Sequence, residues 1–232
     1  MKSHPDNFAS FYDPKKLGFD LIMVEQGYRK FRKYFKGNIA LELGPATGYM
    51  TQYLKNDFEK LYVVEGSESL LLQIPDYSNV IKINSLFEDF KSPLKFDTII
   101  LNHVLEHIED PVSLLKMIRA WMSNDGILII GVPNAKSFHR LAAVKMGLLK
   151  TEYELNSRDL ELGHYRVYDF PLLRDHVNQA DLKIVTEGGV FLKFLSNSQI
   201  EKLLTKDVID AYFELGDIFK ENSAEIFMIL QK

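Results

Sequence analysis

One stretch decides the fold of this chain, Ala40-Leu41-Glu42-Leu43-Gly44-Pro45-Ala46-Thr47-Gly48. Its apolar first half is typical of a short buried strand, and its second half is a turn with a glycine at each end. Glycine fits where the backbone turns sharply or approaches a ligand closely, and the start of the following helix favours a carboxylate or a phosphate. The turn therefore predicts a nucleotide-type ligand, and a tight strand-to-helix turn without a ligand is the alternative.

Short apolar runs alternate with helical patterns around this stretch, which is the layout of βαβ units and a mainly parallel sheet. The predicted strands are 39–43, 61–65, 80–84, 96–102 and 126–133, and the predicted helices between them are 49–56, 67–73 and 111–122. The last of these helices has a clear start, because Asp110 is an N-cap residue and Pro111 suits the first turn.

The regular alternation breaks after residue 133. An apolar helix is predicted over 137–149, and the polar segment 150–168 has no clear periodicity, which indicates an insertion. Another helix is predicted from Asp169 to Ala180, followed by a strand over 182–187, a helical stretch over 196–220 and a last strand over 225–230.

The composition excludes several classes of protein. The 232 residues carry 28 Lys and Arg against 32 Asp and Glu, for a net charge of −4, with 46% hydrophobic and 26% charged residues, as in a soluble globular protein. With no cysteine there is no disulfide framework, no thiolate metal site and no cysteine nucleophile. No apolar run approaches the roughly 20 residues that span a bilayer. No signal-peptide core follows Met1, so we expect a cytoplasmic protein.

Basic and aromatic residues alternate over residues 28–36, a pattern that also occurs in nucleic-acid binders. Here Phe31, Tyr34 and Phe35 share one helical face and are predicted to pack inward, while the lysines and arginines face water. The acidic net charge favours this interpretation, so nucleic acid is not an expected partner.

Glu65 is the second residue that points to a ligand. It ends the second predicted strand, some 17 residues after Gly48. A carboxylate at that position is placed to accept hydrogen bonds from a ribose diol, whereas alone it reads as a surface helix cap. Together with the glycine turn, it favours the ribose interpretation.

With these residues the sequence resembles a class I S-adenosylmethionine-dependent methyltransferase, of the broad small-molecule group that includes ubiquinone-biosynthesis O-methyltransferases. Glu42, Gly44 and Gly48 match the family's first motif, and Ala46 stands where the family's middle glycine is usual. The turn lacks the G-x-G-x-x-G spacing of dehydrogenases, which disfavours the alternative of an NAD(P)-dependent oxidoreductase. A non-catalytic S-adenosylmethionine-binding protein is the third alternative.

Other segments agree with this resemblance in order and spacing. Leu86 and Phe87 follow the third strand, where the family places residues against adenine, although the family's common acidic residue is absent. Asn102 ends the fourth predicted strand and His103 follows it, where they would face the methionine end of the cofactor and the reacting centre. Residues 163–169 resemble the segment that leads from the substrate-side insertion back into the core.

The resemblance implies S-adenosylmethionine as cofactor, with S-adenosylhomocysteine as product. The Phe11-Tyr12 pair is a candidate lid over the cofactor, as in similar proteins, and ordinary packing is the alternative. The residues expected to bind it are Tyr12, Glu42, Leu43, Gly44, Thr47, Gly48, Glu65, Gly66, Leu86, Phe87, Asn102 and His103.

Methyl transfer is an in-line displacement in which positioning and exclusion of water supply much of the effect. A hydroxyl or ammonium acceptor must also lose a proton, and His103 and then His164 are the candidate catalytic bases, unless each is only hydrogen-bonded to backbone. His103, Glu106 and His107 also have a spacing that suits a divalent metal. Capping at the strand-to-helix junction is the favoured role of Glu106 and His107, and no metal is expected.

The resemblance predicts an α/β fold: a Rossmann-like, seven-stranded, mostly parallel sheet with helices on both faces, an antiparallel last strand and helical insertions. We expect a single domain over 1–232, with an N-terminal helical cap (1–37), a cofactor-binding core (38–135), a substrate-side insertion (136–168) and a C-terminal part of the core (169–232) with a helical insertion over about 196–220. The predicted activity is methyl transfer to an oxygen or nitrogen of a small molecule. The oligomeric state is not predicted.

Overall fold

The computed structural model describes residue 11 and residues 18–232. In this part of the chain, seven strands form one sheet in the order β3-β2-β1-β4-β5-β7-β6. The strands are β1 (Ile39–Leu43), β2 (Lys60–Glu65), β3 (Val80–Asn84), β4 (Phe96–Asn102), β5 (Met122–Pro133), β6 (Lys183–Val190) and β7 (Glu225–Gln231). Strand β7 runs antiparallel to both of its neighbours, and the other neighbouring pairs are parallel. The predicted fold class is confirmed.

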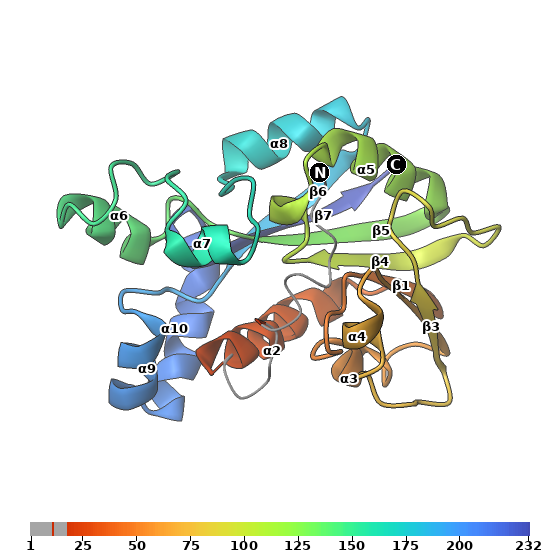
Figure 1. The fold of residues 1–232 in the computed structure, drawn as a ribbon, viewed down its shortest axis with the longest axis horizontal. Coiled ribbons are helices and arrows are strands. Elements are labelled where there is room, and N and C mark those ends of the chain that lie inside the picture. The colour runs from red at the N-terminus through yellow and green to blue at the C-terminus, as the bar shows by residue number, and fades with distance from the viewer. Residues whose placement is uncertain (1–10, 12–17) are drawn as a thin grey trace.

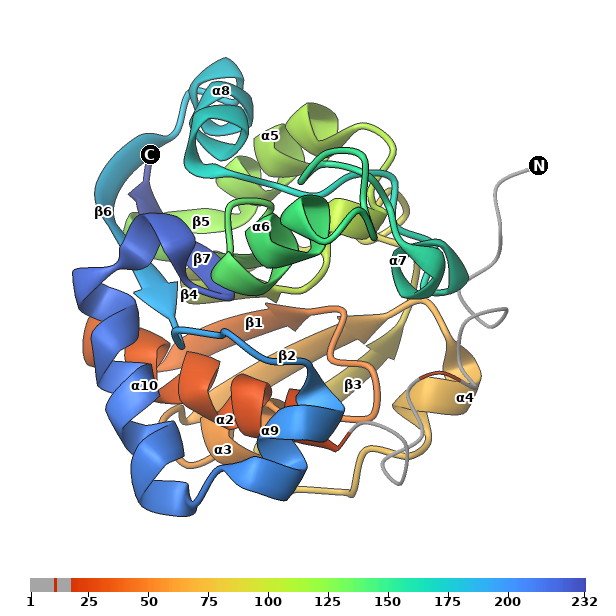
Figure 2. The same ribbon diagram turned by 90° about the vertical axis from the view of Figure 1, so that its left-hand side faces the viewer.

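Helices cover both faces of the sheet (Figures 1 and 2). α5 and α8 lie on one face, and α2, α3 and α10 lie on the other. The α-helices are α2 (Phe19–Phe31), α3 (Thr51–Leu54), α4 (Glu68–Leu71), α5 (Pro111–Trp121), α6 (Phe138–Lys145), α7 (Ser157–Glu161), α8 (Phe170–Gln179), α9 (Asn197–Leu203) and α10 (Lys206–Ile218). Short 3-10 turns are η2 (Arg32–Tyr34), η3 (Leu105–His107) and η4 (Lys220–Asn222). None of the helices in the described ranges has the length and apolar content to cross a membrane.

The two faces of the sheet carry separate hydrophobic clusters. On one face, Leu115 of α5 and Leu173 of α8 are fully buried in a cluster with Leu128 of β5. On the other face, Phe31 of α2 meets Phe227 of β7 edge to face, with ring centroids 5.5 Å apart. Burial of a large apolar side chain stabilises the fold by roughly 1.5–3 kcal/mol. Helix α5 is fixed on the sheet by several such residues, namely Leu114, Leu115, Ile118 and Trp121.

Among the differences from the sequence-based expectation, three change the order or the start of elements. Strand β5 begins at Met122, directly after α5, and not at residue 126. The segment 150–168 contains a short helix, α7, which starts with a capping box between Asn156 and Asp159. The stretch 196–220 is divided into α9 and α10 because Leu204 is extended, with φ −100° and ψ 134°. These are local backbone features that hydrophobic periodicity does not detect.

Segment 136–168 leaves the sheet after β5 and returns beside it. Asn134 pairs with Tyr168 in an isolated parallel bridge, and the backbone N–H of Ala135 donates to the carbonyl of Tyr168 over 2.7 Å. The helices that this detour contains, α6 and α7, gather with α9 at one end of the sheet (Figure 1). They enclose the edge at which β1, β2 and β4 end. The division of the chain into a cap, a core and two insertions stays a prediction.

Candidate active site

A cavity of about 1340 Å³ opens at the carboxyl end of the parallel strands. Sites for one small ligand usually measure roughly 300–1,000 Å³, so this cavity has room for two ligands side by side. Its walls come from the turn after β1, the ends of β2 and β4, α7 and the segment that follows β6. Ligands of open α/β sheets bind at this edge, where the connections that leave two neighbouring strands go to opposite faces of the sheet.

The turn after β1 has three residues in the left-handed region of the backbone, Gly44 (φ 67°), Ala46 (φ 48°) and Gly48 (φ 82°). A Cβ atom on Gly44 would lie 2.7 Å from Cγ2 of Val104, and one on Gly48 would lie 3.1 Å from Ile74. Glycine is thus required at both ends of the turn for packing as well as for conformation. Ala46 adopts the same conformation with a methyl group, at a cost of about 1 kcal/mol.

Glu65 lies at the end of β2 and is held there by the backbone. The N–H of Ala46 donates to Oε2 of Glu65 over 3.1 Å, and the N–H of Ser67 donates to Oε1 over 3.0 Å. The carboxylate is therefore fixed at the cavity wall.

Glu42 lies in β1 beneath the same turn and is almost fully buried. The hydroxyl of Thr51 donates to its Oε2 over 2.6 Å. The pKa of Glu42 is raised to about 7. Burial is the main cause and the nearby charge of Glu65 adds to it, while the hydrogen bond from Thr51 opposes both. Both carboxyl groups are buried and line the cavity, Glu42 beneath the turn and Glu65 at the end of β2.

His103 follows β4 with a left-handed backbone (φ 54°), fixed by a hydrogen bond of 2.9 Å from its N–H to the carbonyl of Gly131. Its Nε2 lies 2.9 Å from Oε1 of Glu225, and its Nδ1 lies 3.4 Å from Oε1 of Glu106. Burial lowers the pKa of His103, but the two carboxylates outweigh this effect and raise the pKa well above its usual value. The ring is therefore an imidazolium at neutral pH.

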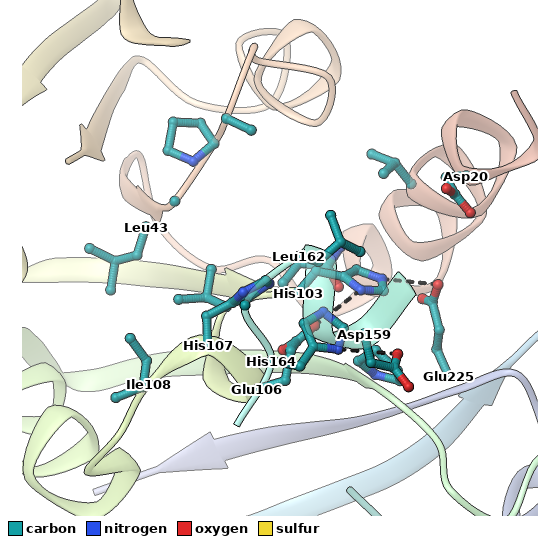
Figure 3. Close-up of a pocket in the computed structure, with 18 of the residues that line it drawn as sticks. Asp20, Leu43, His103, Glu106, His107, Ile108, Asp159, Leu162, His164 and Glu225 are labelled. Carbon is teal, nitrogen blue, oxygen red and sulfur yellow. Dashed lines mark ion pairs between the residues drawn. The ribbon is translucent and has the colours of Figure 1, made fainter. Parts of the chain in front are cut away.

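His164 returns from the insertion and stands beside His107 (Figure 3). The two rings meet edge to face with centroids 4.6 Å apart, and Nδ1 of His164 lies 3.3 Å from Oδ1 of Asp159. Burial lowers the pKa of His107 to about 4, so this ring is neutral at physiological pH. One potential metal-ligating atom each from Glu106, His107 and His164 lie within 4.8 Å of one another. The expectation that no metal binds stays a prediction.

The methyltransferase-domain family matches residues 24–187 of this chain. The chain belongs to this family. The resemblance to class I S-adenosylmethionine-dependent methyltransferases is confirmed, and the protein is a methyltransferase enzyme with S-adenosylmethionine as its cofactor. No curated protein matches the chain.

Solved methyltransferase structures share the fold over nearly the whole chain. An S-adenosylmethionine-dependent methyltransferase from Thermotoga maritima, described as a possible histamine N-methyltransferase, is 18% identical, with a TM-score of 0.69 and coverage of 99% of this chain and 100% of that one. The N-methyltransferase NodS from Bradyrhizobium japonicum, in complex with S-adenosylhomocysteine, is 14% identical, with a TM-score of 0.64 and coverage of 98% and 96%. A complex of the Haloferax volcanii Trm112 methyltransferase activator with a methyltransferase matches at 12% identity, with a TM-score of 0.66 and coverage of 100% and 98%.

The structure brings most of the predicted cofactor residues of this methyltransferase together. Those that line the cavity are Glu42, Leu43, Gly44, Glu65, Gly66, Leu86, Phe87, Asn102 and His103. Thr47 and Gly48 lie in the same turn but do not line the cavity, because Gly48 packs on Ile74 and the Thr47 hydroxyl is buried. Tyr12 lies outside the described residues. The binding role of each residue stays a prediction.

Several cavity residues of the methyltransferase were not predicted from the sequence. Glu225 begins β7, and Lys193 follows β6 with its ammonium 2.5 Å from Oδ1 of Asn197. On α2, Asp20 accepts from the amide of Asn197 over 2.6 Å and pairs with Arg158 of α7. No motif marks these residues, because only the crossing of distant segments brings them to one cavity.

Proposed function

We propose that this methyltransferase transfers the methyl group of S-adenosylmethionine to an oxygen or nitrogen of a small-molecule acceptor. The observation that carries the proposal is a cavity large enough for two ligands, with the Gly44 turn and Glu65 on one side and the insertion on the other. When bound, the cofactor supplies a methyl group on a sulfonium, which a nucleophile displaces in line.

The cofactor half of the cavity has groups that suit each part of such a molecule. The Glu65 carboxylate would accept from the ribose hydroxyls, and Leu86 and Phe87 offer apolar surface for adenine. Oδ1 of Asn102 is buried without a hydrogen-bond partner among the described residues, so it would accept from the methionine ammonium. These contacts fix the position of the methyl group.

The acceptor half is enclosed by the insertion, which supports a small acceptor. Arg140 links the segments of this wall. Its guanidinium donates to Oδ2 of Asp159 over 3.1 Å and to the carbonyl of Glu152 over 3.0 Å. Such a closed wall excludes water from the reacting atoms. The small-molecule acceptor, the cytoplasmic location and the absence of nucleic-acid partners stay predictions.

His103 and His164 stay the predicted catalytic bases, and the surroundings of the two rings differ. A ring that already holds two protons has no lone pair for another, so the raised pKa of His103 counts against this role at neutral pH. The ring of His164 lines the cavity, and its Nδ1 lies 3.3 Å from Oδ1 of Asp159.

Incubation with S-adenosylmethionine labelled in the methyl group tests the proposal. The substrate would be a cell extract separated into small molecules, protein and nucleic acid. We expect label in the small-molecule fraction together with S-adenosylhomocysteine. Label confined to protein or nucleic acid would refute the small-molecule acceptor. Cofactor binding without product in any fraction would favour a non-catalytic binding protein. A change in NADH fluorescence when NADH is mixed with the protein would favour an oxidoreductase.

A further inference from the structure

Three ionisable side chains meet on the acceptor side of the cavity, and they come from separate elements. His103 follows β4, Glu106 lies in η3, and Glu225 begins β7. The imidazole lies between the carboxylates, 2.9 Å from Glu225 and 3.4 Å from Glu106, and Figure 3 marks both ion pairs with dashed lines. All three residues line the cavity.

Each of the two carboxylates has one oxygen outside these ion pairs. Oε2 of Glu225 and Oε2 of Glu106 are buried and receive no hydrogen bond from the described residues. A buried acceptor atom without a partner is costly, and native proteins rarely leave one unsatisfied. A ligand in the cavity that brings hydrogen-bond donors would satisfy these oxygens.

The charges of this cluster do not cancel. Two carboxylates flank one imidazolium, which leaves a net charge of about −1 on the three groups. Among the other charged groups of this part of the cavity, Arg140 pairs with Asp159 and Arg158 with Asp20. The Lys193 ammonium donates to the neutral amide of Asn197 and acts on Glu225 through its charge. Beside the two Oε2 atoms, the carboxylates favour a ligand atom that brings hydrogen-bond donors and becomes positively charged during the reaction.

We infer that the methyl-accepting atom is an amine nitrogen, held by Oε2 of Glu225 and by Glu106 through its N–H groups. The inference rests on the proposed function and narrows it. An oxygen nucleophile reacts best as an anion, and two adjacent carboxylates oppose an anion. An amine attacks with its lone pair and keeps its N–H groups free to donate to the carboxylates.

The bonds and charges of the transfer balance without a further reactant. The amine enters neutral, after its ammonium form has released a proton to water. The nitrogen–carbon bond forms as the carbon–sulfur bond breaks, and the bonding pair returns to sulfur. The positive charge moves from sulfur to the new methylammonium, which the carboxylates stabilise most in the transition state and product. Loss of one proton to water then gives the methylated amine.

Transfer from S-adenosylmethionine carrying a ¹³C methyl group into a small-molecule extract tests the inference without knowledge of the acceptor. The carbon chemical shift and its coupling in the purified product distinguish nitrogen-linked from oxygen-linked methyl groups. We expect a nitrogen-linked methyl group. An oxygen-linked group overturns the inference and leaves the proposed function intact. The absence of any methylated small molecule overturns both.

The variant Glu225→Gln tests the role of the carboxylate with the same acceptor. We expect kcat/KM to fall about 10- to 100-fold, since a hydrogen bond to a charged group is lost, while S-adenosylhomocysteine binding and the melting temperature change little. The control Glu221→Gln, at an exposed position just before β7, should retain the wild-type kcat/KM. Equal values for both variants overturn the inference.

Titration of the histidine ring protons by NMR provides a readout that does not depend on turnover. In Glu225→Gln the pKa of His103 should fall toward its ordinary value, since one flanking charge is gone. An unchanged titration contradicts the charge cluster.

Treatment with EDTA provides the last test. If EDTA abolishes activity and a divalent cation restores it, the Glu106 oxygens bind a metal together with His107 and His164, and the inference is overturned.

Discussion

Nε2 of His103 lies 2.9 Å from Oε1 of Glu225, which joins the end of β4 to the start of β7 across the cavity. This contact is possible because β7 runs antiparallel to β5, so that the first residue of β7 lies at the edge where the parallel strands end. The imidazolium and the carboxylate therefore form one unit that belongs to two distant parts of the chain.

This ion pair makes stability depend on pH in a defined direction. A histidine whose pKa is raised on folding contributes its full stabilisation below the unfolded pKa of about 6.5, and loses it as the pH rises through the folded pKa. The difference in free energy of unfolding between wild type and His103→Asn should therefore shrink from about pH 6 to pH 9 in urea titrations. A difference that grows over this range contradicts the assignment.

Glu42 should make the protein less stable as the pH rises. Its pKa is about 7 in the fold against 4.5 for an ordinary glutamate, so its ionisation above about pH 4.5 costs up to roughly 3 kcal/mol by pH 7.5. Glu42→Gln keeps an oxygen to accept from Thr51 and cannot ionise. We expect the variant to gain stability relative to wild type as the pH rises through this window. A constant difference in urea unfolding would show that Glu42 is not perturbed.

Ala46→Gly tests the strain in the turn after β1. Ala46 has a φ of 48°, where a side chain destabilises the folded state by about 1–2 kcal/mol and glycine does so very little. Glycine also gains entropy in the unfolded chain, which opposes part of this gain. The variant should be equal to wild type or up to about 1 kcal/mol more stable by thermal unfolding. Gly48→Ala is the opposite change, with a φ of 82° and a crowded Ile74, and should be destabilised by more than 1 kcal/mol. If Ala46→Gly were the less stable of the two, the strain argument would be wrong.

Arg140 should hold the acceptor wall without affecting the cofactor side. Its guanidinium pairs with Asp159 and donates to the carbonyls of Glu152 and Glu154, and its side chain is buried. Arg140→Met removes these contacts, so the insertion should become more sensitive to limited proteolysis, while S-adenosylhomocysteine affinity stays within about twofold of wild type. Lys145→Met, at the exposed end of the same helix, is the control. Equal cleavage of the two variants would contradict the role of Arg140.

Local patterns predicted residues that the structure brings to one wall of the cavity. The glycine turn and Glu65 each lie at the end of a short apolar run, and parallel strands bring such ends to one edge. The acceptor half depends on residues such as Glu225 and Lys193, which no motif marks and which only tertiary packing brings together. His103 was placed correctly at the edge, but its charge depends on Glu225, so its protonation could not be read from the sequence.

The central claim is that this methyltransferase binds its cofactor at the Glu65 edge of the sheet. Calorimetric titration with S-adenosylhomocysteine tests it most directly, using wild type, Glu65→Gln and the control Glu68→Gln, an exposed carboxylate three residues further on. We predict that wild type and Glu68→Gln bind with equal affinity, and that Glu65→Gln binds about 10- to 100-fold more weakly. No binding by folded wild type, or equal affinity for Glu65→Gln, would contradict the claim.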